Sequence, residues 1–408
     1  MTSGALCGVL RNAFSDALRN IDVGRSVQAA LASYPHVRSF DVIAVGKAAP
    51  IMLAGALGLL EHRVRRALVV TTDGTTCPLF DERVTVLRAS HPVPDQRSTL
   101  AASAAASFAS SCISELLLVL VSGGTSSLLC APIDAPLEDY RVLTGTLLSA
   151  GASIRDVNTV RRHLSAIHGG RLAQASSVPV RTLILSDVIG GESHDVGSGP
   201  ACTDPTTRRQ AQRVLRRYLP PDLAEMWISR VRETPKPGSA LSRRLDCSII
   251  VGPDQLAHAL ATQLRARGFR CTSSMVPNAR ADQLVTLLLD EARRLGPHEA
   301  HVVSCEPTLQ LPDEKGRGGR AGWVALSALL QLPSGTALLA GASDGIDGSS
   351  GSGGACVAAE HAALVSAARA SIALQQCDDA SVHRDLATHL PDVPTGLNLT
   401  DVYVVARA

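Results

Sequence analysis

Short runs of apolar residues, each ended by glycine, serine or another turn residue, recur through the first 190 positions. Such runs are typical of strands buried on both faces of a parallel sheet. We expect strands at 40–45, 67–71, 84–87, 116–121 and 180–185. The run 116–121, Leu-Leu-Leu-Val-Leu-Val, is the longest of those that end in a glycine turn, and we expect it at the centre of the sheet.

Between these strands, apolar residues recur at spacings of three and four, which indicates helices. The expected helices cover 5–33, 48–60, 98–110, 137–149 and 158–175, the last with a break at Gly169 and Gly170. Strands that alternate with helices predict an α/β fold with a doubly wound, mostly parallel, Rossmann-like sheet. Ligands of such sheets bind beyond the carboxyl ends of the strands.

The segment 233–243 is rich in proline, glycine, serine and charge, and we place a domain boundary there. The predicted domains are 1–238 and a smaller α/β domain at 239–408. In the second domain we expect strands at 247–251, 301–304, 308–311, 336–340 and 402–406. We expect one helix that ends near residue 267, and further helices at 280–295, 322–331 and 355–370. The pattern leaves open whether the final strand returns to the first domain.

Composition narrows the classes of function. Hydrophobic residues make up 45% of the 408 positions, which excludes a disordered chain. A net charge of +2 argues against a surface for nucleic acid, and aromatic residues, at 3%, are too few for a base-stacking platform. We find no apolar run of 18 residues, so no membrane partner is expected. The ten cysteines lie at least 18 positions apart, which suits reduced thiols in a cytoplasmic protein.

The turn after the expected central strand is a candidate anion-binding loop. Its residues are Ser122, Gly123, Gly124, Thr125 and Ser126. Glycines let backbone N–H groups approach an anion without an intervening Cβ, and a following helix adds partial positive charge. The alternative is a tight turn between strand and helix that binds nothing.

Two other polar residues follow expected strand ends. Lys47 stands in Val-Gly-Lys-Ala, which is not a Walker A loop because Asp41 and Ala48 replace its first glycine and its hydroxyl residue. A lysine at such a turn can still meet a phosphate as a point charge, or it can be a solvated surface residue. Asp187 follows the strand 180–185. Because Lys47, the loop at 122–126 and Asp187 share one expected edge, the three together favour a ligand site.

The second half offers a basic, glycine-rich loop with Gly316, Gly318, Gly319 and Arg320. It is either an anion loop before a helix or a mobile, solvated segment. It also matches a dinucleotide fingerprint formally, but four residues separate it from its strand, which excludes that interpretation. Asp344 and Asp347 could hold Mg²⁺ or form Asx turns.

A basic cluster lies on the expected helix at 158–171. Arg162 is a candidate anion ligand there, with a solvated basic face as the alternative.

The order of these sequence motifs along the chain resembles that of the class II glycerate kinases, whose C-terminal half is called the MOFRL domain. The similarity runs nearly end to end. The matching blocks lie at 45–49, 91–95, 122–132, 156–165, 169–173, 185–188, 197–200, 204–206, 316–320, 344–348 and 395–398.

The resemblance implies two α/β domains with the active site in the cleft between them. It implies phosphorylation of D-glycerate, or a related hydroxy acid, on its 2-hydroxyl, with ATP and Mg²⁺ as cofactors. Lys47 and Arg320 would be catalytic. Ser122–Ser126, Arg162 and Asp187 would bind substrate or phosphate; Gly316, Gly318, Gly319 and Asp344 would bind the nucleotide. The metal ligands stay unassigned, and a homodimer stays open.

Several positions depart from the family pattern. Ala321, Gly322 and Trp323 replace Asn-Gln-Glu; Ser304 and Cys305 replace two glycines; His168 replaces a lysine; Gly191 and Glu192 replace two aspartates; and Thr125 replaces a glycine. These changes leave open an altered substrate or weak activity. Two further alternatives are a hydroxypyruvate reductase, as some relatives have been labelled, and a non-catalytic protein that binds a small acid or nucleotide.

Overall fold

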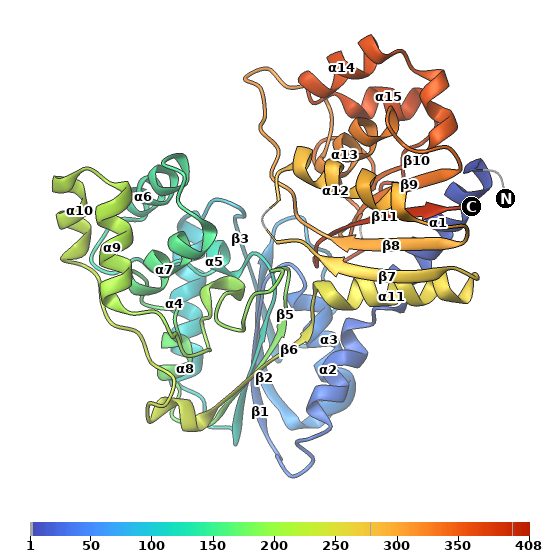
Figure 1. The fold of residues 1–408 in the computed structure, drawn as a ribbon. Helices are drawn as coiled ribbons and strands as arrows, with labels where there is room; N and C mark the ends of the chain where they lie inside the picture. Colours follow the sequence, from blue (N-terminus) through green and yellow to red (C-terminus); the bar gives the residue numbers. More distant parts are fainter. Residues whose placement is uncertain (1–2, 278, 394) are drawn as a thin grey trace. The chain divides into compact units, whose positions relative to one another are not determined.

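The computed structural model describes residues 3–277, 279–393 and 395–408, which form two compact units (Figure 1). The six-stranded unit consists of Val23–Ser186 and Gly191–Val251. The five-stranded unit consists of the chain up to Asp22, Asp187–Gly190 and Gly252–Ala408. Each unit has its own sheet and its own core.

The sheet of the six-stranded unit is wholly parallel, with the order β3-β2-β1-β4-β5-β6. Its strands are β1 (Phe40–Val45), β2 (Val64–Thr72), β3 (Val84–Ala89), β4 (Leu116–Val121), β5 (Val180–Leu185) and β6 (Leu245–Val251). Every residue of β1, β4 and β5 is buried, as the uniformly apolar runs predict. The expected doubly wound sheet is confirmed.

Helices cover both faces of this sheet. Figure 1 shows α2 (Val23–Leu31) and α3 (Ala49–Leu60) on one face, with α4 (Gln96–Ser110) on the other. Beyond α4 lies a helical layer with its own core, which includes Tyr140 and Trp227. The helices that contribute to this core are α6 (Leu137–Ser149), α7 (Ile154–His163), α9 (Arg208–Tyr218) and α10 (Pro221–Ile228). The short helices α5 (Thr125–Leu128) and α8 (Arg171–Gln174) contact α4.

The five-stranded unit has a mixed sheet in the order β10-β9-β11-β8-β7, in which only the β7–β8 pair is parallel. Its strands are β7 (Arg270–Met275), β8 (Glu299–Ser304), β9 (Thr336–Ala342), β10 (Gly354–Ala358) and β11 (Asp401–Arg407). Its helices are α1 (Ser3–Asn20), α11 (Pro253–Ala266), α12 (Ala281–Arg294), α13 (Arg320–Leu329), α14 (Ala367–Gln375) and α15 (Asp379–Asp385).

Different helices pack on the two faces of this mixed sheet. Phe14 of α1 packs against Gly341 on one face. Leu338 and Ala340, whose side chains alternate with that position, join α12 and α13 in the core on the other face.

The division of the chain differs from the predicted boundary at 238/239. The strand β6 pairs with β5, so it extends the first sheet instead of opening the second domain. Helix α1 packs on α11, β9 and β10, which places this first helix in the five-stranded unit. The final strand, β11, lies between β9 and β8 and does not return to the first sheet.

Some expected elements are wrong in detail. The segment 355–370, expected as a helix, begins with β10, because pairing with β9 overrides its alanine-rich helix propensity. The strand expected at 308–311 is reduced to a single bridge at Thr308, and the polar strand β7 was not expected. The helices expected at 5–33 and 158–175 are each two helices. Within the described residues, no helix is both long and apolar enough to span a membrane.

Candidate active site

The order of the parallel sheet reverses between β1 and β4. From β1 the chain winds outward through β2 and β3, then returns to β4 and winds the other way. Loops beyond the carboxyl ends of two such strands diverge and leave a crevice where ligands of this fold bind. Lys47 follows β1, and Ser122–Ser126 follow β4, so the structure brings these predicted site residues together.

Backbone contacts tie the two strand-end turns to each other. The N–H group of Lys47 donates to the carbonyl oxygen of Gly123 at 2.9 Å, and that of Ala48 donates to the hydroxyl of Ser122 at 3.1 Å. The two turns come very close at Gly46, whose φ is 123°, because a Cβ on Gly46 would lie 2.7 Å from the carbonyl oxygen of Ser122. A glycine is therefore needed before the candidate lysine.

The loop at 122–126 presents open backbone donors. Within the described residues, the N–H groups of Gly123, Gly124, Thr125 and Ser126 have no hydrogen-bond acceptor. Four consecutive free donors make this loop a candidate anion site, although α5, which follows, is a single turn and adds little helix dipole. We call residues 122–126 the anion loop.

Thr125, which replaces a usual glycine, is buried and supports this loop. Its hydroxyl lies 3.1 Å from the carbonyl oxygen of Val45 and 2.8 Å from that of Ser122. The side chain thus fastens the anion loop to the end of β1 and does not fill the space in front of the open donors.

The Lys47 side chain is half-buried, and its ammonium group has no hydrogen bond or ion pair to any described residue. It is one of only three lysines among the 39 basic residues of the chain. His91 lies beside it and is also half-buried. Burial and the positive charge of Lys47 lower the pKa of His91 to about 4, so the ring is neutral at physiological pH.

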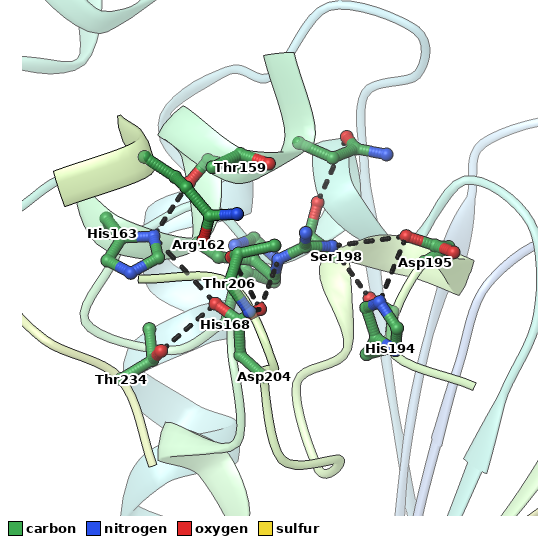
Figure 2. Close-up of polar contacts among 12 residues, drawn as sticks. Thr159, Arg162, His163, His168, His194, Asp195, Ser198, Asp204, Thr206 and Thr234 are labelled. Carbon is green, nitrogen blue, oxygen red and sulfur yellow. Dashed lines mark hydrogen bonds and ion pairs between the residues drawn. The ribbon is translucent and has the colours of Figure 1, made fainter. Parts of the chain in front are cut away.

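Arg162 lies behind the anion loop and is fully buried. Figure 2 shows its guanidinium between Asp204 on one side and His194 and Asp195 on the other. The Nε–Oδ1 distance to Asp204 is 3.1 Å, and Nη1 donates to the carbonyl oxygen of His194 at 3.1 Å. The predicted contact of Arg162 with substrate is therefore not supported: it is committed to a buried carboxylate and has no exposed surface.

This buried network positions a loop that backs the anion loop. Asp204 is held further by Thr206 and Thr234, and His163 lies near it (Figure 2). Between Asp195 and Asp204 the chain turns through Ser198, whose φ of 58° is left-handed and whose hydroxyl lies 2.9 Å from that of Ser126. The sequence analysis assigned no role to Ser198 or Asp204; the residues at 197–200 and 204–206 were visible only as blocks of the family pattern.

In the five-stranded unit, Arg320 is the first residue of α13 and remains partly exposed. Its guanidinium pairs with Glu306 at 2.7 Å and with the buried Asp401 at 3.4 Å. Burial raises the pKa of Asp401 to about 8, against the opposing charge of Arg320. One exposed and one buried carboxyl group thus orient Arg320, and its catalytic role stays a prediction.

The glycine-rich loop before α13 has little free donor capacity. The N–H groups of Gly316, Gly318 and Gly319 are directed to Gln376, Ser349 and Asp379, respectively. At the start of α13, Asp347 accepts from Ala321 at 3.0 Å and from Gly322 at 2.8 Å. A backbone carbonyl oxygen and two side chains of the same unit already accept from these glycine donors, which argues against an anion loop built from them. The glycines are needed where carboxylates approach the backbone.

Two other predicted residues lie in the same unit. Asp344 accepts from the N–H group of Ile346 at 3.0 Å, which is an Asx turn, and it stays half-buried. Asp187 accepts from the side-chain amide of Asn398 at 3.0 Å. Among the described residues, no three His, Cys, Asp or Glu side chains form a group that could hold a metal ion.

The chain is an α/β protein with a doubly wound parallel sheet, and its free backbone donors and unpaired lysine lie at the switch point, the place where proteins of this fold bind their ligands. Comparisons with known proteins identify the family. The model described as "Domain of unknown function (DUF4147)" matches residues 9–231, and the model of the MOFRL family matches residues 299–401. The chain belongs to the family that combines these two domains.

Relatives are similar over most of their length. A D-glycerate 2-kinase of Thermotoga maritima is 30% identical, covering 89% of each chain. A protein of Agrobacterium vitis named "Putative hydroxypyruvate reductase" is 34% identical over 86% of this chain and 82% of its own. The crystal structure of a glycerate kinase from Thermotoga maritima matches 99% of this chain and all of its own with a TM-score of 0.86 at 27% identity. The predicted family and two-domain α/β class are thus confirmed.

Proposed function

We propose that this protein is a kinase that transfers the γ-phosphoryl group of ATP to the 2-hydroxyl of D-glycerate. The proposal rests on one observation. Lys47, whose ammonium group has no partner among the described residues, and the open N–H donors of Gly123–Ser126 lie together at the switch point. The relatives named glycerate 2-kinase and glycerate kinase support the choice of substrate.

The chemistry suits these groups. Phosphoryl transfer proceeds through a loose transition state whose charge is spread over the phosphoryl oxygens, so positioning and positive charge supply most of the catalysis. Lys47 would meet the transferring group as a point charge. The anion loop would hold the carboxylate of glycerate or the phosphoryl oxygens through its backbone N–H groups.

Arg320 would supply a second positive charge. Its contacts with Glu306 and Asp401 fix the guanidinium before substrate binds, which lowers the entropy lost on binding. Since Lys47 belongs to one unit and Arg320 to the other, each can be removed without disturbing the local contacts of the other.

The carboxylate groups available in the five-stranded unit bear on how ATP and Mg²⁺ would bind. Asp344 is half-buried and uses one carboxylate oxygen in its Asx turn, and it is the predicted nucleotide-binding residue whose carboxylate would best suit contact with a nucleotide-bound cation. Mg²⁺ prefers one or two carboxylates with phosphate oxygens and water, so the lack of a three-residue group among the described positions fits a metal that arrives with the nucleotide. When bound, Mg²⁺ would neutralise charge on the β- and γ-phosphates.

The turn after β1 argues against the reductase alternative. A dinucleotide-binding turn needs a second glycine two residues after the first, so that the backbone can approach the pyrophosphate. Here Ala48 stands at that position and Ile51 at the position of the third glycine. The side chain of Lys47 projects from the same turn.

One assay decides between the two activities. Purified protein is incubated with Mg²⁺, ATP and D-glycerate, and NMR identifies the position of the phosphate in the product. A parallel reaction measures oxidation of NADH by hydroxypyruvate. Formation of 2-phosphoglycerate without NADH oxidation is expected; NADH oxidation without phosphorylation would support the reductase instead.

A further inference from the structure

His91 lies beside Gly124 at the switch point although it follows β3, an edge strand of the sheet. The loop after β3 is fastened to α5 next to the anion loop, because the hydroxyl of Ser127 donates to the carbonyl oxygen of Pro92 at 2.6 Å. Further along the loop, Asp95 caps α4 and pairs with Arg97, so its charge is engaged away from the histidine. The chain is thus held before His91 by the pairing of β3 with β2, and after His91 by these two contacts.

The His91 ring lies against Gly124 of the anion loop. A Cβ on Gly124 would lie 3.2 Å from Cδ2 and 3.6 Å from Nε2 of His91, and 3.6 Å from Cγ of Lys47. The imidazole and the lysine side chain therefore flank the same residue of the anion loop. Within the described part of the chain, neither ring nitrogen of His91 has a hydrogen-bond partner.

We propose that His91 is a further catalytic residue, the group that accepts the proton of the acceptor hydroxyl during phosphoryl transfer. This inference rests on the proposed kinase function. In the step, a bond forms between the hydroxyl oxygen of glycerate and the γ-phosphorus, and the bond from that phosphorus to the oxygen bridging the β-phosphate breaks. The hydroxyl proton moves to a ring nitrogen of His91, which releases it to solvent after the product leaves.

The electrostatics fit this role. Lys47 is the charged group that acts on His91 in the free protein, and together with burial it keeps the ring unprotonated, so that a lone pair is available. A bound phosphate or carboxylate beside Lys47 offsets that positive charge and stabilises the protonated imidazole. Substrate binding would therefore convert a weak base into a competent one at the moment of transfer.

The first test observes the ring directly. The C2–H resonance of His91, assigned by its loss in His91→Gln, is titrated in the protein alone and with sodium tripolyphosphate as the probe. We expect the pKa of His91 to rise by about one unit or more when the probe is present, and to rise also in Lys47→Met without the probe. A pKa that neither change moves would overturn the placement of His91 beside the anion site.

The second test uses kinetics with ATP and D-glycerate. His91→Gln should lower kcat by roughly 10²- to 10⁴-fold, with the KM for ATP within about threefold, and should remove the acidic limb of the pH profile. His62→Gln, an exposed residue of the same unit, is the matched control and should match the wild type. Thermal melts verify that each variant is folded; if the glutamine variant is not, His91→Asn takes its place.

The outcomes separate the two proposals. A wild type that does not phosphorylate glycerate overturns the proposed function and, with it, this role for His91. An active wild type whose His91→Gln variant keeps its kcat and its pH profile overturns the role of His91 alone.

Discussion

The backbone N–H group of Lys47 donates a 2.9 Å hydrogen bond to the carbonyl oxygen of Gly123. This bond joins the turns that follow β1 and β4, the two strands at which the sheet order reverses. The lysine and the anion loop are therefore parts of one rigid arrangement, fixed by the backbone before any ligand binds. Such preorganisation is what electrostatic catalysis requires.

The fit of Gly46 against Ser122 predicts the effect of adding one methyl group. Gly46→Ala would place a Cβ 2.7 Å from a backbone oxygen at a φ of 123°, so we expect a loss of roughly 2–4 kcal/mol in the free energy of unfolding. Urea unfolding of the purified variant measures it. Gly145→Ala, on the exposed face of α6 with nothing within 4 Å, is the control and should stabilise by about 1 kcal/mol. Equal effects of the two substitutions would contradict the account of this turn.

Removal of the Lys47 charge should cost activity without costing stability. Lys47→Met is expected to lower kcat/KM for phosphorylation by about 10²- to 10³-fold, since the ammonium group is proposed to stabilise the transferring phosphoryl group. Its melting temperature should stay close to that of the wild type, because the ammonium has no partner among the described residues. Lys47→Arg keeps the charge and should recover part of the rate. A methionine variant within threefold of the wild type would refute the role of Lys47.

The buried Asp401 predicts a stability that falls as the pH rises. Its pKa is raised from 3.8 to about 8, so the folded protein holds a proton that the unfolded chain releases near pH 3.8. Between these values the wild type loses stability, whereas Asp401→Asn has no such proton to lose. The advantage of the asparagine variant in the free energy of unfolding should grow by about 1 kcal/mol or more between about pH 5 and about pH 9. A constant difference would contradict the raised pKa.

His168 predicts the opposite trend in acid. The ring is buried, neither nitrogen has a hydrogen-bond partner within the described chain, and burial lowers its pKa from 6.5 to about 3. The unfolded chain therefore binds a proton below pH 6.5 that the folded protein resists, and stability is lost as the pH falls through this range. His168→Leu leaves no polar partner unsatisfied and should unfold at a lower pH than the wild type in an acid titration followed by circular dichroism. The exposed His62→Leu should leave the midpoint unchanged.

Much of the six-stranded unit was predictable because its strands are buried on both faces. The runs 40–45, 116–121 and 180–185 coincide with β1, β4 and β5 residue for residue. Their ends located the lysine and the anion loop, since residues after parallel strands share an edge. The mixed sheet was less predictable: β7 is mostly polar, and β10 has a helix-forming composition that pairing with β9 overrides.

The site was predictable where a residue follows a strand and unpredictable where its partner is distant in sequence. Arg162 resembled an exposed basic face of a helix, and only the position of Asp204, 42 residues on, shows that it is buried. The N–H group of Gly319 and those at the start of α13 looked free until Asp379 and Asp347, respectively, were placed against them. His91 was visible only within the block 91–95 of the family pattern, and its place beside Gly124 depends on how the loop after β3 folds back.

The most direct test of the central claim is a 31P and 1H NMR analysis of the product formed from Mg²⁺-ATP and D-glycerate, with L-glycerate and Lys47→Met as controls. The account predicts 2-phosphoglycerate from the wild type with D-glycerate, and a rate reduced by at least about 10²-fold in Lys47→Met. Failure of folded wild-type protein to phosphorylate D-glycerate, or a product phosphorylated only at another hydroxyl, would contradict it.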